Sequence, residues 1–296
     1  MNYCPVCGTK VIGAFCIACG HQLTMTPTPT PRSEVHFDLA HVEPNAGPRA
    51  SSRQTIELPT GERRRHIVFE TWFVMIAFLV PVVTDAVLTF FHAYSGASEQ
   101  RFPSVVSNDV ANLLLGMLAY LPVLAVVPIA LFLLWRTGQG RRELGLGAPS
   151  FKRDVWPGLG IGAAAFGIEI AMIVPFSALI TRHSRLINAV SVGHFPKYYL
   201  IEGIFMAAVT AITEEVLVNG YLITRLYQLG WSPRASLILS LALRTSYHVY
   251  YGFGFLLTIP FGYLVTRSFQ KHAKLNRPIV AHFLYDAILI TISILG

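Results

Sequence analysis

Three clusters of ionisable side chains interrupt otherwise apolar stretches in the second half of this sequence. They are the adjacent pair Glu214 and Glu215, the pair Arg244 and His248, and the pair His282 and Asp286. An ionisable group in the middle of a bilayer costs a few kcal/mol unless it is paired or faces a cavity. The clusters therefore indicate one shared functional site, with a purely structural polar network as the alternative.

The spacing within the clusters predicts which side chains can meet. Both His-containing pairs have members four residues apart, so on a helix each pair shares one face, and the same holds for Glu215 and Asn219. Adjacent helical residues point about 100° apart. We therefore expect only one glutamate to face the site, with the other holding a neighbour.

These residue types suit the hydrolysis of a peptide bond. Two neighbouring carboxylates resist joint ionisation in a low dielectric unless a cation is near. Such a glutamate can act as a general base on a water molecule that a histidine also holds. The remaining histidine, with a polar partner, can stabilise the oxyanion. A proton-coupled transporter would also place Glu, His and Asp in its spans, and this reading stays open.

The elements that must position these residues are transmembrane helices. Hydrophobic residues make up 53% of the 296 residues and charged residues only 13%, against about 25% charged in an ordinary soluble domain. This composition excludes a normal soluble enzyme. It predicts an all-α polytopic transmembrane bundle of seven or eight spans over 67–296. The apolar stretches are approximately 67–93, 110–135, 155–180, 198–224, 235–251, 253–266 and 278–295. The fifth and sixth are short, so they either belong to a compact core or include a broken or re-entrant segment.

The positive charges indicate how the bundle is oriented. Lys and Arg concentrate before the first stretch, between the second and third, after the fourth and after the sixth, which all lie on one side and are therefore expected to be cytoplasmic. The N-terminus shows no signal peptide pattern, so we expect it to be cytoplasmic in a multi-pass protein of the cell membrane. Topology accounts for the net charge of +7, and no nucleic acid partner is expected.

Four cysteines near the N-terminus form two C-x-x-C pairs, Cys4 with Cys7 and Cys16 with Cys19. Four thiolates in this arrangement predict a structural Zn²⁺ site in a ribbon over 1–23, with two disulfides or a redox pair as alternatives. A closed four-thiolate site leaves no open position for catalysis. Residues 24–66 are rich in Pro and Thr and predict a disordered linker.

The order and spacing of these motifs resemble the CPBP family, which comprises CAAX prenyl proteases and bacteriocin-processing or self-immunity proteins (the ABI family). The resemblance covers about 198–290. It rests on Glu214-Glu215-x-x-x-Asn219, on His248 followed by Val-Tyr-Tyr-Gly, and on His282-x-x-x-Asp286.

The resemblance implies an intramembrane glutamic endopeptidase with an all-helical bundle. Glu214 and His248 would activate the attacking water, and Glu215 would support the site. His282 with Asp286 would stabilise the oxyanion. The resemblance leaves open whether the active site needs a metal.

The sequence departs from the family pattern at three positions. Asn219 stands where the family usually has Arg, Arg244 where it usually has Phe, and Asp286 where it often has Asn. We expect Arg244 to replace the missing cation as counter-ion to the glutamate pair. Asp286 would be either protonated or set to fix the tautomer of His282.

The sequence thus predicts a membrane-embedded endopeptidase acting on a membrane-associated peptide or protein, prenylated or not. Its partners would be the lipid bilayer, the substrate and a cytoplasmic protein docked on the ribbon. A non-catalytic immunity or scaffold protein is the main alternative. Glu169, Glu202 and Asp85 fit an interface or helix-pairing role as well as a site role, and they are left out of the predicted site. Counting residues places His248 deeper than His282, so we expect one span boundary to be wrong.

Overall fold

The computed structural model describes residues 60–95, 108–182 and 199–295, and within these ranges every regular element is helical. The predicted zinc ligands Cys4, Cys7, Cys16 and Cys19, and the predicted linker up to residue 59, lie outside the described residues. The ribbon and its Zn²⁺ therefore remain predictions.

Four helical segments precede the motif-bearing half of the chain. Helix α1 spans Gly61–Ser95. The second apolar stretch is divided into α2 (Asp109–Ala119), α3 (Leu121–Leu124) and α4 (Val126–Arg136). A proline at the start of α3 has no N–H to donate, which suits a break at that position. A π-helical turn, η1 (Phe151–Val155), leads into α5 (Trp156–Arg182).

The motifs lie on the helices that follow. Helix α7 (Tyr199–Glu214) continues through the π-helical segment η2 (Glu215–Leu222) into α8 (Ile223–Gln228). Helix α9 (Pro233–Ser246) starts at a Ser232 cap and is followed by the 3₁₀ segment η3 (Val249–Leu257). Helices α10 (Thr258–His272) and α11 (Asn276–Leu295) complete the bundle.

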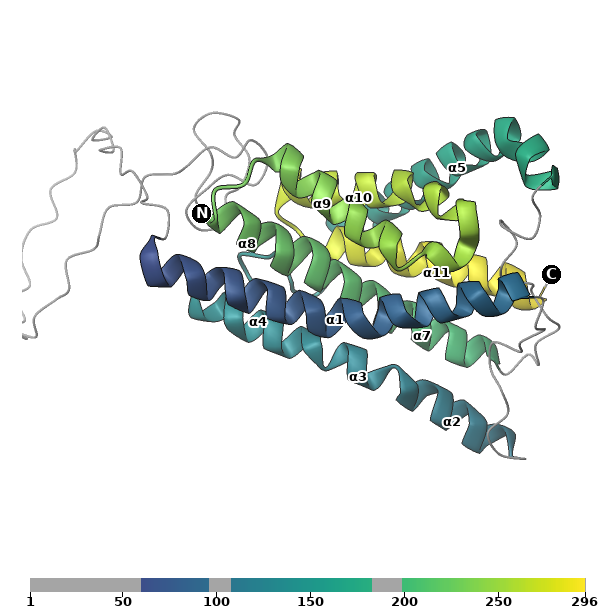
Figure 1. Cartoon of the computed structure of the whole chain (residues 1–296), viewed down its shortest axis with the longest axis horizontal. Helices are drawn as coiled ribbons and strands as arrows, with labels where there is room; N and C mark the ends of the chain where they lie inside the picture. The colour runs from purple at the N-terminus through teal and green to yellow at the C-terminus, as the bar shows by residue number, and fades with distance from the viewer. Residues whose placement is uncertain (1–59, 96–107, 183–198, 296) are drawn as a thin grey trace, which may run out of the picture.

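Helix α11 packs against α7 and α5, and α10 packs against α9 and α5. The long helices run roughly along the same direction, with α1, α4 and the α7–α8 segment side by side (Figure 1). The main core holds large, fully enclosed side chains from several of these elements, including Phe78, Leu134, Leu217, Tyr221 and Phe269. This packing holds the motif-bearing elements in one body.

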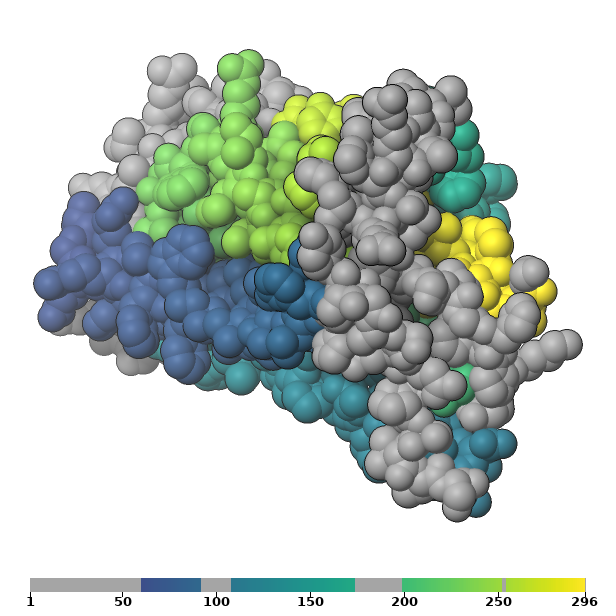
Figure 2. All heavy atoms as spheres, turned by 45° about the vertical axis from the view of Figure 1, so that its right-hand side comes forward, coloured from purple at the N-terminus to yellow at the C-terminus, as the bar shows by residue number. Residues whose placement is uncertain are grey.

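The outer surface of the bundle is apolar, as a lipid-facing surface requires. Figure 2 shows α1 along one outer face, where Phe69 is 71% exposed and Phe73 60%. Four helical segments are long and apolar enough to cross a membrane, namely 61–91, 109–136, 151–173 and 276–295. These features define a helical membrane protein, and the count of seven or eight spans stays a prediction.

One predicted boundary is wrong, and the fifth and sixth apolar stretches do not coincide with single helices. The linker was expected to reach residue 66, but α1 begins at Gly61 because the helix continues beyond the apolar stretch through its charged first turns. The fifth stretch, 235–251, ends as a helix at Ser246. The sixth, 253–266, divides between η3 and an α10 that continues to His272, because charged and polar residues extend the helix past the apolar run.

Candidate active site

The glutamate pair lies at the junction of α7 and η2, inside the bundle. Glu214 is 6% exposed and Glu215 is fully buried. The junction is also where the hydrogen bonding widens from α to π, a local change that is frequent at functional sites.

Arg244 of α9 is the counter-ion of both carboxylates. Its Nη1 lies 3.3 Å from Glu214 Oε2, and its Nη2 lies 2.9 Å from Glu215 Oε1. The contact expected between Arg244 and the glutamate pair is therefore present. Both glutamates thus meet one guanidinium, and which of them faces the substrate stays a prediction.

Glu215 is held by donors on both of its oxygens. Asn219 Nδ2 donates to Oε2 at 2.5 Å, one helical turn along the chain. His282 Nδ1 lies 2.9 Å from Oε1, the oxygen that also faces Arg244. A fully buried carboxylate with three such neighbours is held in place, so its geometry suits support of the site.

Tyr247 contacts the other glutamate, a contact that the sequence analysis missed. Its hydroxyl donates to Glu214 Oε2 at 2.7 Å, and its ring packs edge-on against Phe78 of α1. Its place between Arg244 and His248 in the sequence was the available signal. The structure thus adds a buried hydrogen-bond donor beside Glu214.

His248 does not share a helical face with Arg244, so this part of the prediction is wrong. After α9 the backbone forms a tighter turn, in which the His248 N–H donates to Thr245 O at 3.1 Å. The Arg244 carbonyl is therefore free to accept another hydrogen bond. His248 Nδ1 donates to that carbonyl at 2.7 Å. Because a carbonyl only accepts, the proton of a neutral ring is on Nδ1, and Nε2 keeps its lone pair.

This break in the helix accounts for the conflict of depth noted in the sequence. His248 lies in the turn after α9 and is not one helical turn further along it. Its ring lies 4.9 Å from the ring of Tyr247, whose hydroxyl contacts Glu214, so the turn brings His248 beside the glutamate pair.

His282 and Asp286 meet across one turn of α11, as their spacing predicts. His282 Nε2 lies 3.4 Å from Asp286 Oδ2, while Nδ1 faces Glu215. Each ring nitrogen of His282 therefore faces a carboxylate. The Asp286 side chain is 26% exposed and the Glu215 side chain is fully buried, so the Nε2 side is the open side of the ring.

Two further acidic residues are buried outside this cluster. Glu169 of α5 accepts a hydrogen bond from Tyr285 of α11, and the Tyr285 ring packs 5.0 Å from Phe261. Glu202 of α7 packs over Gly116 of α2, where a Cβ would overlap its carboxylate. Both glutamates join pairs of helices, which fits the helix-pairing alternative of the two roles that the sequence left open.

Within 60–95, 108–182 and 199–295, no group of three or more His, Cys, Asp and Glu side chains is arranged to hold a metal ion. The groups that converge are an acid–base set: three carboxylates, one guanidinium, one phenol and two imidazoles. Such a set can hold a water, take its proton and donate hydrogen bonds to a developing negative charge.

Residues 196–288, from just before α7 to within α11, match the family described as Rce1-like, type II CAAX prenyl endopeptidase. The match covers about a third of the chain and contains all six predicted catalytic residues. Over this segment the resemblance found in the sequence is confirmed, and the CAAX protease family implies a membrane endopeptidase. The comparisons with curated proteins and with solved structures gave no match.

Proposed function

We propose that this chain is an intramembrane glutamic endopeptidase that hydrolyses a peptide bond in a membrane-associated peptide or prenylated protein. The observation that carries the proposal is the meeting of Glu214, Arg244 and His282 from α7, α9 and α11 around one buried ion-pair network. His248 stands beside this network with Nε2 free of the Arg244 carbonyl.

In the proposed reaction, a water molecule is held between the Glu214 carboxylate and His248 Nε2. Glu214 takes the proton of the water as its oxygen attacks the scissile carbonyl carbon. The tetrahedral intermediate then collapses, the C–N bond breaks, and the proton passes to the leaving amine. Arg244 and Tyr247 keep the Glu214 carboxylate oriented during these steps.

The developing oxyanion would accept a hydrogen bond from His282 Nε2. The contact of this atom with Asp286 Oδ2 is long, at 3.4 Å, and Asp286 is the more exposed partner. A substrate carbonyl oxygen could therefore replace the Asp286 oxygen as acceptor. Glu215 on Nδ1 would hold the ring in place, and Asp286 would keep a proton on Nε2 until substrate arrives.

The predicted N-terminal ribbon would serve this enzyme as a docking module. Cys4, Cys7, Cys16 and Cys19 would hold a structural Zn²⁺, and a cytoplasmic protein would bind the folded ribbon. This assignment places the N-terminus and the basic loops in the cytoplasm and the site in a multi-pass bundle of the cell membrane.

The test is cleavage of a candidate membrane peptide by the purified full-length protein. We expect Glu214→Gln, His248→Ala and His282→Ala each to reduce kcat by at least about a hundredfold, with unfolding midpoints in detergent close to the wild type. Glu202→Gln, a change in another buried glutamate of α7, is the matched control and should retain cleavage.

Retention of full cleavage by all three variants would overturn the proposed mechanism. Solute flux through the wild-type protein, with no detectable cleavage of peptides, would favour the transporter. Replacing the four cysteines with serine should spare cleavage, because the predicted zinc site is closed.

A further inference from the structure

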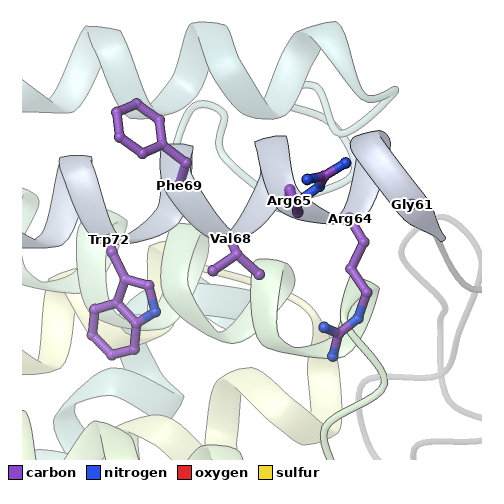
Figure 3. Close-up of a pocket in the computed structure, with 6 residues that line it drawn as sticks. All are labelled: Gly61, Arg64, Arg65, Val68, Phe69 and Trp72. Atoms are coloured by element: carbon purple, nitrogen blue, oxygen red, sulfur yellow. The ribbon is translucent and has the colours of Figure 1, made fainter.

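An open groove on the outer face of α1 lies at the end of the bundle where that helix begins. Its volume is about 670 Å³, within the range of small-molecule sites. Six residues of α1 line it: Gly61, Arg64, Arg65, Val68, Phe69 and Trp72. Figure 3 shows the two arginines near the start of the helix and the apolar side chains further along it.

The two arginines of the groove carry charges that the described protein does not neutralise. Both are exposed, and neither has an acidic partner within 60–95, 108–182 and 199–295. Glu70, the next acidic residue along α1, is already paired with Arg225 at 3.3 Å and with Arg136 at 3.6 Å. The groove therefore presents two guanidiniums to a ligand from outside.

The apolar side chains continue the groove toward the membrane interior. Arg64, Val68 and Trp72 are spaced four residues apart, and Arg65 and Phe69 share the same spacing, so two neighbouring stripes each run from charge to apolar surface. Phe69 is 71% exposed and Trp72 39%. From the first arginine to Trp72 the helix rises about 12 Å.

We propose that this groove is a binding site for an anionic phospholipid. The Arg64 and Arg65 guanidiniums match the phosphate oxygens of a headgroup, which arginine can contact through two parallel hydrogen bonds. Val68, Phe69 and Trp72 would contact the glycerol region and the first part of the acyl chains, at the depth where Trp is common in membrane proteins. A small free anion would leave this apolar part unused. The inference does not depend on the proteolytic activity.

The test is native mass spectrometry of the full-length protein released from micelles that contain equal amounts of phosphatidylglycerol and phosphatidylcholine. The wild type should retain phosphatidylglycerol preferentially. Arg64→Gln with Arg65→Gln should reduce that retention roughly thirtyfold, since each of the two basic residues near an anionic surface contributes on the order of 1 kcal/mol. The matched control, Arg63→Gln with Arg141→Gln, removes two charges outside the groove. Its retention of phosphatidylglycerol should stay within about twofold of the wild type.

Three outcomes would overturn the proposal. Equal retention of the two lipids would show that the headgroup charge is not recognised. An equal loss in the control variant would assign the binding to diffuse charge. Inorganic phosphate that displaces the lipid at matched concentration would show a simple anion site, whereas a lipid site should also weaken in Phe69→Ala.

Discussion

Replacing Arg244 with methionine removes the guanidinium that contacts both buried glutamates while keeping a long, unbranched side chain. In the native protein its nitrogens lie 3.3 Å from Glu214 Oε2 and 2.9 Å from Glu215 Oε1, and the residue is only 3% exposed. Water cannot replace the lost cation at so enclosed a position. The two carboxylates would then repel one another across adjacent positions of the chain.

The expected cost follows from these distances. Two unit charges about 4 Å apart attract by about 4 kcal/mol at an effective dielectric constant of 20. Removing one partner of a buried pair costs about 3–5 kcal/mol in measured cases, because the other charge stays buried. For a chain of this size, such a loss corresponds to a fall of about 10 °C or more in the unfolding midpoint.

The assay is thermal unfolding of purified Arg244→Met in detergent, with cleavage of a membrane peptide measured in parallel. The variant should unfold earlier and lose activity. The double variant Glu215→Gln with Arg244→Met removes one charge of each sign and should regain part of the lost stability, with an interaction free energy of about 2–3 kcal/mol. Arg225→Met is not a suitable control, because this buried arginine also has an acidic partner.

A midpoint for Arg244→Met within about 2 °C of the wild type would refute the counter-ion role. So would a double variant that is as unstable as the sum of the two single variants, because independent sites give additive effects.

Tyr247→Phe removes the hydrogen bond to Glu214 Oε2 and should lower kcat roughly tenfold, as the loss of a hydrogen bond to a charged group suggests; steady-state cleavage kinetics check this, and an unchanged kcat would exclude a role. Glu169→Leu leaves the Tyr285 hydroxyl without its carboxylate partner and should lower stability by about 1–3 kcal/mol while sparing the activity of the folded fraction; selective loss of kcat would instead make Glu169 functional. Gly262→Val should displace Leu241 and Arg244, since a Cβ there would lie 3.0 Å from Leu241 Cδ2 and 3.2 Å from Arg244 Cδ; cleavage should fall relative to Gly160→Val, where an added Cβ has no neighbour within 4 Å.

Much of the site could be predicted from residue spacing. The contacts of His282 with Asp286 and of Glu215 with Asn219 are each formed within one helical turn. A four-residue separation on a helix brings side chains together whatever the rest of the bundle does. The absence of the usual cation from the first motif also predicted that Arg244 would turn toward the glutamates.

The end of α9 could not be predicted in the same way. The apolar stretch 235–251 continues past Ser246 without a proline or glycine to stop it. The helix ends because the Arg244 carbonyl accepts a hydrogen bond from the His248 ring. The backbone N–H groups of Tyr247 and His248 donate to the Thr245 carbonyl instead. Competition between a side chain and the backbone for one carbonyl does not alter the hydropathy pattern.

The sequence by itself determined the membrane-embedded helical class, the identity of the motifs and the contacts within single helical turns, because these depend on composition and on helical period. Only the tertiary structure decided that both glutamates meet one guanidinium, that Tyr247 donates to Glu214, and which nitrogen of His248 is free. The contacts of the two glutamates join residues about 30 positions apart in the sequence. Their geometry follows from how the helices pack and where α9 ends, which no local pattern specifies.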